Sequence, residues 1–225
     1  MSFADKKLSE IAISIPGSTA LLREYDLDFC CGGADTLGAA VAEKNLNLAE
    51  IEARLTELQE SKQQDDEQRW LTAPYAEIIE HIIHRYHERH RAQLQELIVL
   101  AERVESVHGD RDDCPVGVAA ELHNVYADLS SHMMKEEQIL FPMIKMGNYA
   151  MARMPIQVME HEHAEHGEHL EVLKALTNNL TPPADACNTW RALYSGIKEF
   201  MDDLMMHIHT ENNILFPRVI EEGSR

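Results

Sequence analysis

The sequence contains few aromatic residues and no long apolar run. Phe, Trp and Tyr make up 6% of its 225 residues, and no stretch approaches the roughly 18 consecutive apolar residues that a transmembrane helix requires. No segment shows the alternation of apolar and polar residues that is typical of strands. Segments rich in Leu, Ile, Ala, Glu and Met therefore predict an all-α protein.

Basic residues are also scarce. The chain has 20 Lys and Arg against 39 Asp and Glu, a formal net charge of −19. No basic cluster occurs locally, so we expect no nucleic-acid surface that follows a phosphate backbone. Four cysteines in a chain of this length do not form the disulfide framework of a small secreted domain. The N-terminal residues MSFADKKLSE contain no apolar signal segment, so we expect a cytoplasmic protein that does not bind membranes.

An internal repeat is the strongest positive feature of the sequence. HMMKEEQILFP, residues 132–142, recurs 75 residues later as HIHTENNILFP, residues 207–217. The copies align without a gap and share a histidine, a glutamate four residues later and a Leu-Phe-Pro end. Side chains four residues apart lie on one face of a helix. Each copy therefore predicts an imidazole and a carboxylate directed at one point: His132 with Glu136, and His207 with Glu211.

The flanking apolar residues predict that both pairs point inward, because each pair continues a stripe of apolar residues with helical spacing. The stripes contain Leu122, Val125, Leu129, Leu140 and Met143 in the first copy, and Ile197, Phe200, Leu204 and Leu215 in the second. Burying a histidine and a carboxylate costs several kcal/mol unless they pair or bind a metal. A hydrogen bond within one pair is the simpler alternative, but the repetition of the pair favours a shared metal site.

Two further histidine-rich segments supply candidate ligands. On a helix over residues 75–107 the apolar seam includes His87 and His90, and on a helix over residues 156–178 it includes His163 and His166. His87 and His163 precede the histidine of the following repeat copy by 45 and 44 residues. This match predicts His87 and His163 as ligands, with His90 and His166 as the alternatives.

The helical segments predict a four-helix bundle after a small N-terminal helical domain. Bundle helices are expected at residues 75–107, 118–145, 156–178 and 186–220. Residues 1–60 predict the small domain, with helices at 8–15, 18–25, about 35–44 and from residue 47 onward. Between them, residues 61–74 begin with a polar, charged segment and predict a linker before a bundle over residues 75–225.

Two adjacent cysteines, Cys30 and Cys31, interrupt the helices of the N-terminal domain and are followed by two glycines. We expect this turn to lie just ahead of a helix N-terminus, where the helix dipole lowers the pKa of a thiol, and to be open to a partner. Burial as two small apolar side chains in the domain core is the alternative. Cys114 and Cys187 lie in loop-like segments without a Cys or His at metal-binding spacing, and we expect both to be structural.

The predicted site contains four imidazoles and two carboxylates: His87, His132, Glu136, His163, His207 and Glu211. Two carboxylates are too few to complete two metals separately, so we expect both to bridge, with two terminal histidines on each metal. Imidazole with carboxylate suits iron better than magnesium or calcium, which prefer all-oxygen ligands. A ferritin-like site needs Glu-x-x-His motifs, for which only Glu160 and His163 are well placed.

This pattern resembles the hemerythrin-like di-iron fold. With CCGG at residues 30–33, RYH at residues 85–87 and the two Leu-Phe-Pro motifs, the chain is similar over essentially its full length to the iron-sulfur cluster repair proteins of the repair of iron centres family, YtfE or ScdA type. The resemblance implies a hemerythrin-like four-helix bundle joined to a ScdA-type N-terminal domain. It also implies two non-haem iron ions, bridged by carboxylates, on the six predicted ligands, and a role for Cys30 and Cys31.

The same resemblance implies a function. We expect a cytoplasmic protein that repairs iron-sulfur clusters damaged by oxidative or nitrosative stress, by donating iron or by reacting with nitric oxide at a diferrous site. Reduction of NO to N2O would make it an enzyme, and Cys30 and Cys31 are candidates for redox chemistry or for NO or iron transfer. The expected partners are damaged iron-sulfur proteins, with NO or O2 as small ligands. A homodimer is compatible with the sequence.

Two other functions are compatible with these residues. A hemerythrin-like protein that binds or senses O2 or NO would use the same irons. Oxygen-carrying hemerythrins have a second histidine four residues after the one on the third helix, and this chain has Gly167 there, which favours labile iron over reversible O2 storage. His166 could substitute one position earlier. A helical interaction module whose histidines only bond to one another explains neither the repeat nor its inward direction.

Overall fold

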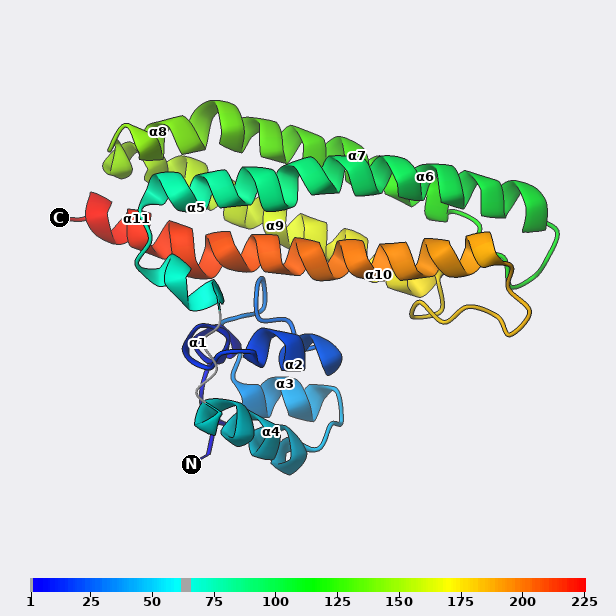
Figure 1. Cartoon of the computed structure of the whole chain (residues 1–225), viewed down its shortest axis with the longest axis horizontal. Coiled ribbons are helices and arrows are strands. Elements are labelled where there is room, and N and C mark those ends of the chain that lie inside the picture. Colours follow the sequence, from blue (N-terminus) through cyan, green and yellow to red (C-terminus); the bar gives the residue numbers. More distant parts are fainter. Residues whose placement is uncertain (1, 62–65) are drawn as a thin grey trace.

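The computed structural model describes residues 2–61 and 66–225. In this part of the chain the regular structure is helical, and no β-strand occurs beyond one isolated bridge between Lys7 and Thr36. The predicted all-α class is confirmed. Long helical rods lie side by side in one body, and short helices form a smaller body beside it (Figure 1). None of the described helices has the length and apolar character needed to cross a membrane.

The smaller body, here called the N-terminal unit, contains α1 (Leu8–Ser14), α2 (Ser18–Glu24), α3 (Leu37–Glu43) and α4 (Leu48–Glu60). Side-chain caps start its later helices. Thr36 Oγ1 accepts a hydrogen bond from the N–H of Ala39 at 3.3 Å, and Asn47 Oδ1 accepts one from Ala49 at 3.1 Å. Gly17, at φ 79°, allows the reversal between α1 and α2. Helices therefore form close to the predicted positions.

The rods of the bundle are built from one or more helical segments. They comprise α5 (Tyr75–His81), η2 (Ile82–His87) and α6 (Glu88–His108); α7 (Val118–Lys135), η3 (Glu136–Leu140) and α8 (Phe141–Lys145); α9 (Tyr149–Leu176); and α10 (Asn188–His209), η4 (Thr210–Leu215) and α11 (Phe216–Gly223). Helix α6 packs against α7 and α10, while α9 packs against α7 and α11. The predicted four-helix bundle is present, and its first, second and fourth rods match the predicted bounds within three residues.

The segments η2, η3 and η4 are π-helical turns inside otherwise α-helical rods. Such a turn holds an extra residue and therefore rotates the residues after it about the helix axis. Segments η3 and η4 are followed by the prolines of the repeat, Pro142 and Pro217, in the first turns of α8 and α11. Because proline has no N–H to donate and clashes with the preceding α-helical turn, a wider turn suits this position.

The π-helical turns change which side chains point inward. Met143, predicted in the apolar stripe, is only partly buried, whereas its neighbour Ile144 is 1% exposed. Ile83, placed in the seam of the first bundle helix, is also only partly buried, and Ile82 is buried instead. The predicted stripes assumed 3.6 residues per turn throughout, and the extra residue of a π-helical turn shifts the register.

The third rod begins earlier than the sequence predicts. Helix α9 runs from Tyr149 to Leu176 and contains Pro155, whereas the prediction placed a loop through this proline. Packing holds the early turns in place. Ala152 is buried, and α11 approaches so closely that a Cβ added to Gly223 would lie 2.8 Å from the backbone of Tyr149. This packing favours the early helical turns, although Pro155 cannot donate a backbone hydrogen bond within them.

The junction between the N-terminal unit and the bundle is packed against the bundle. The predicted linker, residues 61–74, includes residues 62–65, which lie outside the described residues. Beyond them, the 3-10 turn η1 (Asp66–Leu71) contains Trp70, whose ring stacks on that of His81 with centroids 4.3 Å apart. Arg218 donates hydrogen bonds to the carbonyl oxygens of Trp70 and Ala73, both at 2.8 Å. This described part is therefore not a solvated spacer, and the domain boundaries stay predictions.

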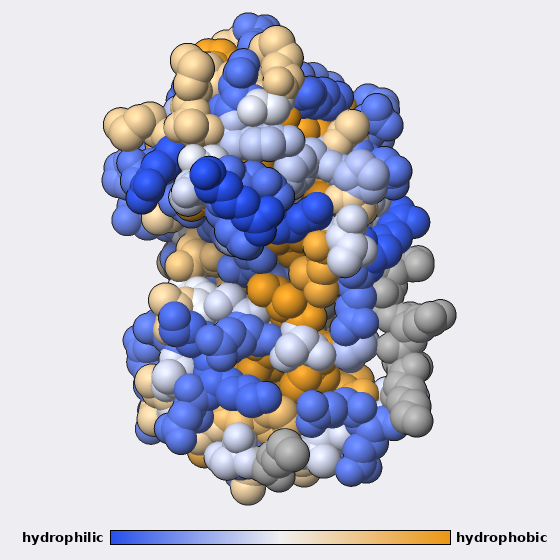
Figure 2. Space-filling view, turned by 90° about the vertical axis from the view of Figure 1, so that its left-hand side faces the viewer, coloured by the Kyte–Doolittle hydropathy of each residue, from blue (hydrophilic) through white to orange (hydrophobic). Residues whose placement is uncertain are grey.

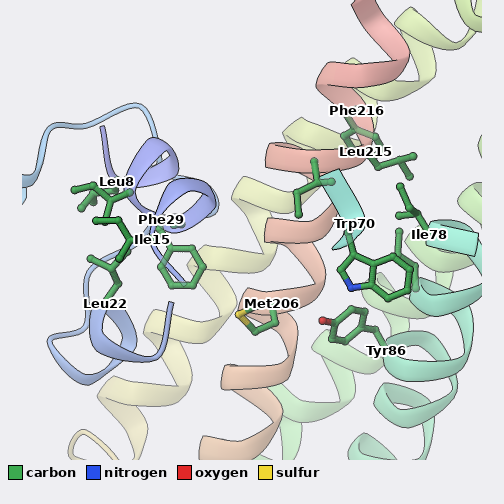
Figure 3. Close-up of a cluster of buried hydrophobic side chains, with 14 of the residues drawn as sticks. Leu8, Ile15, Leu22, Phe29, Trp70, Ile78, Tyr86, Met206, Leu215 and Phe216 are labelled. Atoms are coloured by element: carbon green, nitrogen blue, oxygen red, sulfur yellow. The ribbon is translucent and has the colours of Figure 1, made fainter. Parts of the chain in front are cut away.

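Buried apolar side chains continue from the N-terminal unit into the bundle. Phe29 of the unit and Met206 of α10 belong to one cluster, which also contains Trp70 and Tyr86 (Figure 3). A second cluster, which includes Trp190, fills the other end of the bundle. Hydrophobic residues also reach the surface where the two bodies meet, framed by hydrophilic ones (Figure 2). The N-terminal unit is thus packed against the side of the bundle (Figure 1).

The altered register after η3 can be tested by a matched pair of substitutions. Replacing the buried Ile144 by Ala should lower the free energy of unfolding by about 2–5 kcal/mol, because it leaves a cavity in the core. Met143→Ala should cost at least about 1 kcal/mol less, because this side chain is partly in contact with water. Urea denaturation of the metal-free proteins measures both values. Equal losses would contradict the π-helical register.

Candidate metal centre

A polar layer separates the two apolar clusters of the bundle. In the first rod, buried residues 78–86 belong to one cluster and residues 94–104 to the other, with His87 and His90 between them. The clusters change over near Glu136 in the second rod, near His163 in the third and near Glu211 in the fourth. The polar side chains of the four rods therefore meet at one level inside the bundle.

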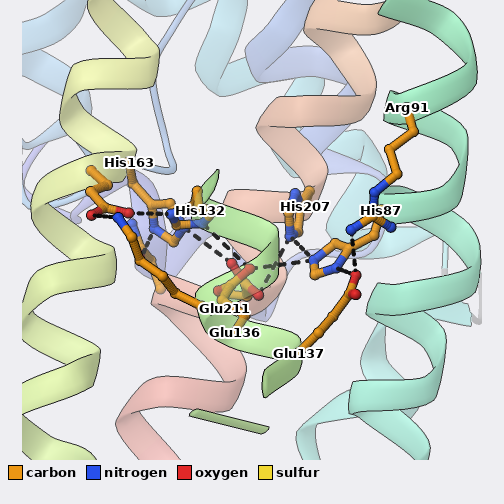
Figure 4. Close-up of polar contacts among 11 residues, drawn as sticks. His87, Arg91, His132, Glu136, Glu137, His163, His207 and Glu211 are labelled. Carbon is orange, nitrogen blue, oxygen red and sulfur yellow. Dashed lines mark hydrogen bonds and ion pairs between the residues drawn. The ribbon is translucent and has the colours of Figure 1, made fainter. Parts of the chain in front are cut away.

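The six side chains predicted as ligands lie together in this layer, and each is at most 1% exposed (Figure 4). They form two overlapping groups whose ligand atoms lie within 4.8 Å of one another: His87, Glu136, His207 and Glu211, and His132, Glu136, His163 and Glu211. Each group takes one histidine from each half of the internal duplication, and the two groups share both glutamates. The predicted residues are thus brought together as two histidine pairs around two carboxylates.

The histidine pairs have the spacing of neighbouring metal ligands. The Nε2 atoms of His87 and His207 are 3.1 Å apart, and those of His132 and His163 are also 3.1 Å apart. Two nitrogens that lie about 2.1 Å from an ion, at a right angle to each other, are separated by about 3 Å. Each pair therefore directs two nitrogens at one point at a distance suited to an ion.

Both carboxylates lie between the histidine pairs. Glu136 Oε2 is 3.4 Å from the Nε2 atoms of both His87 and His132. Glu211 directs one oxygen to each pair, with Oε2 3.1 Å from His163 Nε2 and Oε1 3.4 Å from His207 Nε2. Among the described residues, no hydrogen bond of acceptable geometry reaches these four carboxylate oxygens, which are all buried. Uncompensated buried carboxylates are costly, so this donor set fits a bound cation.

The π-helical turns position several of these residues. His87 is the last residue of η2, Glu136 is the first of η3, and Glu211 lies in η4. π-Helical turns inside α-helices occur frequently at functional sites. Here the π-helical turns lie in the polar layer. The backbone thus departs from α-helical geometry at the same level of the bundle at which the donor groups occur.

Polar side chains form hydrogen bonds with the Nδ1 atoms of three of these histidines. These side chains are not among the site residues predicted from the sequence. Glu137 accepts from His87 Nδ1 at 2.8 Å, and Glu162 accepts from His132 Nδ1 at 2.9 Å. In the same way, the Nδ1 of His163 lies 2.8 Å from the side-chain oxygen of Asn212. A proton on Nδ1 leaves the Nε2 lone pair free for a metal. Glu137 and Asn212 directly follow the repeated glutamates Glu136 and Glu211. Their shared position in the repeat could have indicated a common role beside the ligands.

These contacts also change the proton affinities of the site. Burial lowers the pKa of His87, but the Glu136 and Glu137 carboxylates outweigh it and raise that pKa to about 9. Burial also lowers the pKa of His163, but the Glu211 carboxylate outweighs this effect and raises that pKa to about 9. Burial and the neighbouring His87 hold the pKa of His207 well below its usual value. Without an ion, protons on imidazoles can therefore balance the buried carboxylates, and a metal must displace them.

The alternative ligands lie close to the site but outside the two groups. His90 and His166 are buried, and the Nε2 of each lacks a hydrogen-bond partner in the described structure. The ring of His166 lies edge-on to His132, with centroids 4.9 Å apart. Glu160, required by the ferritin-like alternative, is exposed and belongs to neither group. The geometry thus favours His87 and His163 over their neighbours.

The cysteine turn lies against the bundle beside one histidine pair. The side chain of Asp28 accepts hydrogen bonds from the N–H groups of Cys30 and Cys31 at 2.9 and 3.0 Å. The Cys31 thiol donates to the backbone oxygen of His163 at 3.3 Å. The prediction of a turn open to a partner is therefore corrected in part: Cys30 is buried and Cys31 is half-buried.

The helix-dipole prediction for these thiols is wrong. Helix α3 starts at Leu37, with Thr36 as its cap, so the cysteines lie too far ahead of its N-terminus. The hydrogen bond between the two thiols raises the pKa of Cys30, as do burial and Asp28. The same bond lowers the pKa of Cys31. The pair is therefore chemically unequal, and Cys31 is the more readily ionised thiol.

The remaining two cysteines lie in the connections that precede α7 and α10. Cys114 is half-buried, and Cys187 is exposed at the start of α10. The Sγ of Cys187 lies 3.4 Å from the Nε2 of His108, a neighbour that spacing along the chain did not reveal. Neither cysteine belongs to a group of candidate metal ligands among the described residues.

Loss of a side chain that bonds to the Nδ1 of a proposed ligand should lower the affinity of the site for metal. Glu162→Gln keeps the size of the side chain but removes the charge that orients His132, and it should weaken metal binding about 10–100-fold. Glu171→Gln, at an exposed position on the same helix, is the control and should leave affinity unchanged. Competition with a chelator under anaerobic conditions measures both. Equal affinities of the two variants would remove Glu162 from the support of the site.

Comparisons with known proteins agree with this geometry. Residues 78–219 match the model of the hemerythrin HHE cation binding domain, and residues 4–59 match ScdA_N, a domain of unknown function. A "Probable iron-sulfur cluster repair protein" of Haemophilus influenzae is 69% identical over 222 residues, which cover 99% of this chain and 100% of the relative.

Two further relatives carry a more specific name. The "Iron-sulfur cluster repair protein YtfE" of Musicola paradisiaca is 57% identical over 98% of both chains, and that of Escherichia coli O81 is 56% identical over 98% of this chain and 99% of its own. Identity of this level over the whole length, together with the two domain matches, shows the family. The chain belongs to the YtfE-type iron-sulfur cluster repair proteins, in which a ScdA_N domain precedes a hemerythrin HHE domain.

Proposed function

We propose that this chain repairs damaged iron-sulfur clusters and that its buried His/Glu layer holds two non-haem iron ions. The observation that carries the proposal is the pair of carboxylates, Glu136 and Glu211, whose buried oxygens have no hydrogen-bond partner in the described structure and lie between two imidazole pairs. The names of full-length relatives support the repair function. Damaged iron-sulfur proteins would be its clients.

The donor set favours iron. Imidazole and carboxylate together suit iron, whereas magnesium and calcium prefer all-oxygen sites. Each proposed ion would receive two histidines, and Glu136 and Glu211 would bridge both ions. This is the arrangement in which four imidazoles and two carboxylates serve two metals without any further side chain. Bound iron would supply metal for incomplete clusters and positions for ligands such as NO.

The chain's own residues control the site around the iron. Glu137, Glu162 and Asn212 hold imidazoles in the tautomer that presents Nε2. Apolar clusters lie on both sides of the polar layer. The layer therefore presents buried donor atoms in low-dielectric surroundings, where electrostatic interactions are strong.

We propose that cations reach this layer through an acidic cavity. It has a volume of about 490 Å³ and lies between α7 and α9, where Asp128, Glu162, Glu165 and Glu168 line it. Glu162 is also hydrogen-bonded to His132, so its carboxylate connects the cavity with a proposed ligand. A protein that donates iron needs such a route, because the ligands themselves are buried.

Cys30 and Cys31 are proposed to act in redox chemistry or in the transfer of NO or iron. Their turn contacts the backbone of His163, which places the thiols next to the metal layer. Asp28, Cys30 and Cys31 also form a group whose ligand atoms lie within 4.8 Å of one another. This placement supports a transfer of metal or of a nitrosyl group between the buried layer and the thiols.

The metal centre can be tested by its iron content. Protein purified without oxygen should contain about two irons per chain, and the double variant Glu136→Ala, Glu211→Ala should lose them, because both ions share these carboxylates. Glu160→Ala removes an exposed carboxylate near the site and should keep both irons. Mass spectrometry for metals measures the content. Folded wild-type protein without iron would mean that the repeat is structural.

The role of the cysteines can be separated from the metal centre. Cys30→Ala with Cys31→Ala should retain about two irons, because neither thiol belongs to the histidine groups, yet repair of a damaged iron-sulfur protein should be largely lost. Cys114→Ala serves as the control and should repair normally. Recovery of cluster absorbance in a reconstituted anaerobic assay provides the readout. Normal repair by the double variant would remove these cysteines from the mechanism.

A further inference from the structure

One side chain joins the cysteine turn to the metal layer. Asn212, in η4, directs its side-chain oxygen at the Nδ1 of His163, 2.8 Å away, and its Nδ2 donates to the backbone oxygen of Cys30 at 3.2 Å. An amide can do this because it carries both an acceptor and a donor. The imidazole and the turn of the N-terminal unit are therefore linked through one rigid, planar group.

Other contacts fix the same turn at the same place. The Cys31 thiol donates to the backbone oxygen of His163 at 3.3 Å, so the turn contacts the main chain of this residue directly and its side chain through Asn212. Asn213 donates to the backbone oxygen of Phe29 at 2.9 Å. Phe29 is fully buried and packs edge-on against His209 of α10, with ring centroids 5.2 Å apart. A shift of the turn must therefore disturb the position of Asn212.

The internal repeat shows that this link is specific to one half of the bundle. Glu137 occupies the position that corresponds to Asn212, and it accepts hydrogen bonds from His87 and Arg91. An ionised carboxylate only accepts, so a glutamate or aspartate at position 212 would place negative oxygens against the carbonyl oxygen of Cys30. The amide of Asn212 can donate to the carbonyl oxygen of Cys30, whereas the carboxylate of Glu137 accepts from Arg91.

We propose that Asn212 is the positioning residue that couples docking of the cysteine turn to metal binding by His163. This inference rests on the proposed function, because it takes His163 as a metal ligand. When His163 is held by a metal, Asn212 is held as well, and its N–H remains directed at the turn. Coupling between two sites is reciprocal. Metal should thus tighten the turn, and a docked turn should slow the loss of metal.

Amide hydrogen exchange of a peptide covering residues 28–33 tests the coupling. In wild-type protein, exchange in this segment should be about fivefold slower or more in the iron-loaded than in the metal-free form, a ratio within the usual range of coupling free energies. Asn212→Asp retains an acceptor for His163 but gives no donor to Cys30. This variant should bind iron, and its exchange in the segment should be the same with and without iron.

Two control variants separate coupling from general loosening. Asn213→Asp removes the Nδ2 donor, which bonds to Phe29 and also contacts His209 Nδ1, without altering the partner of His163, so exchange should rise in both forms while the dependence on iron persists. Glu160→Gln changes an exposed carboxylate that belongs to neither ligand group and should leave the exchange ratio of the turn intact. Release of iron to a chelator should be faster in Asn212→Asp than in Glu160→Gln if the docked turn retains the metal.

The outcomes distinguish the two proposals. Iron-loaded wild-type protein with unprotected residues 28–33 would overturn the coupling and leave the di-iron function standing. Protection that persists in Asn212→Asp would also overturn it, because direct binding of iron by the thiols would then explain the effect. A wild-type protein that binds no iron would overturn the proposed function together with the coupling. The wild-type comparison needs no variant, so a folding defect in Asn212→Asp cannot conceal the answer.

Discussion

The structure depends on the burial of Glu136 and Glu211 in an otherwise apolar bundle. Carboxylates in such surroundings need compensating charge, and the groups that surround them are imidazole nitrogens from four different rods. The other unusual features of the bundle are located next to these two carboxylates. The π-helical turns place donors at one level, side chains behind the histidines hold the tautomer, and apolar clusters close the layer from both ends. The bundle is a scaffold for a cation.

The N-terminal unit belongs to this scheme because it docks at the buried His/Glu layer. Its cysteine turn reaches the backbone of His163 and, through Asn212, the imidazole of the same residue. The two thiols differ, since hydrogen bonding between them raises the pKa of Cys30 and lowers that of Cys31. The junction of the two domains thus has a physical basis, because the cysteine turn and the buried His/Glu layer share contacts.

Much of the site could be predicted because its information is local. Helical spacing placed His132 with Glu136 and His207 with Glu211, and repetition at matched intervals selected His87 and His163. The errors arose where tertiary packing overrides local pattern. Contact with α11 extends α9 through Pro155, and π-helical turns bury Ile144 in place of Met143. The extra residue of a π-helical turn cannot be recognised from the spacing of apolar residues alone, because the packing of neighbouring rods decides which face of the helix is buried.

The sequence by itself determined the helical class, the duplicated half-bundle and the identity of the six inward donors, because each follows from periodicity and spacing along one chain. Only the tertiary structure decided how those donors combine. It joins His87 with His207 and His132 with His163, across the two halves, and it places Asn212 between His163 and Cys30. Such combinations depend on how the rods and the N-terminal unit pack, and packing brings together residues whose separation in sequence carries no signal.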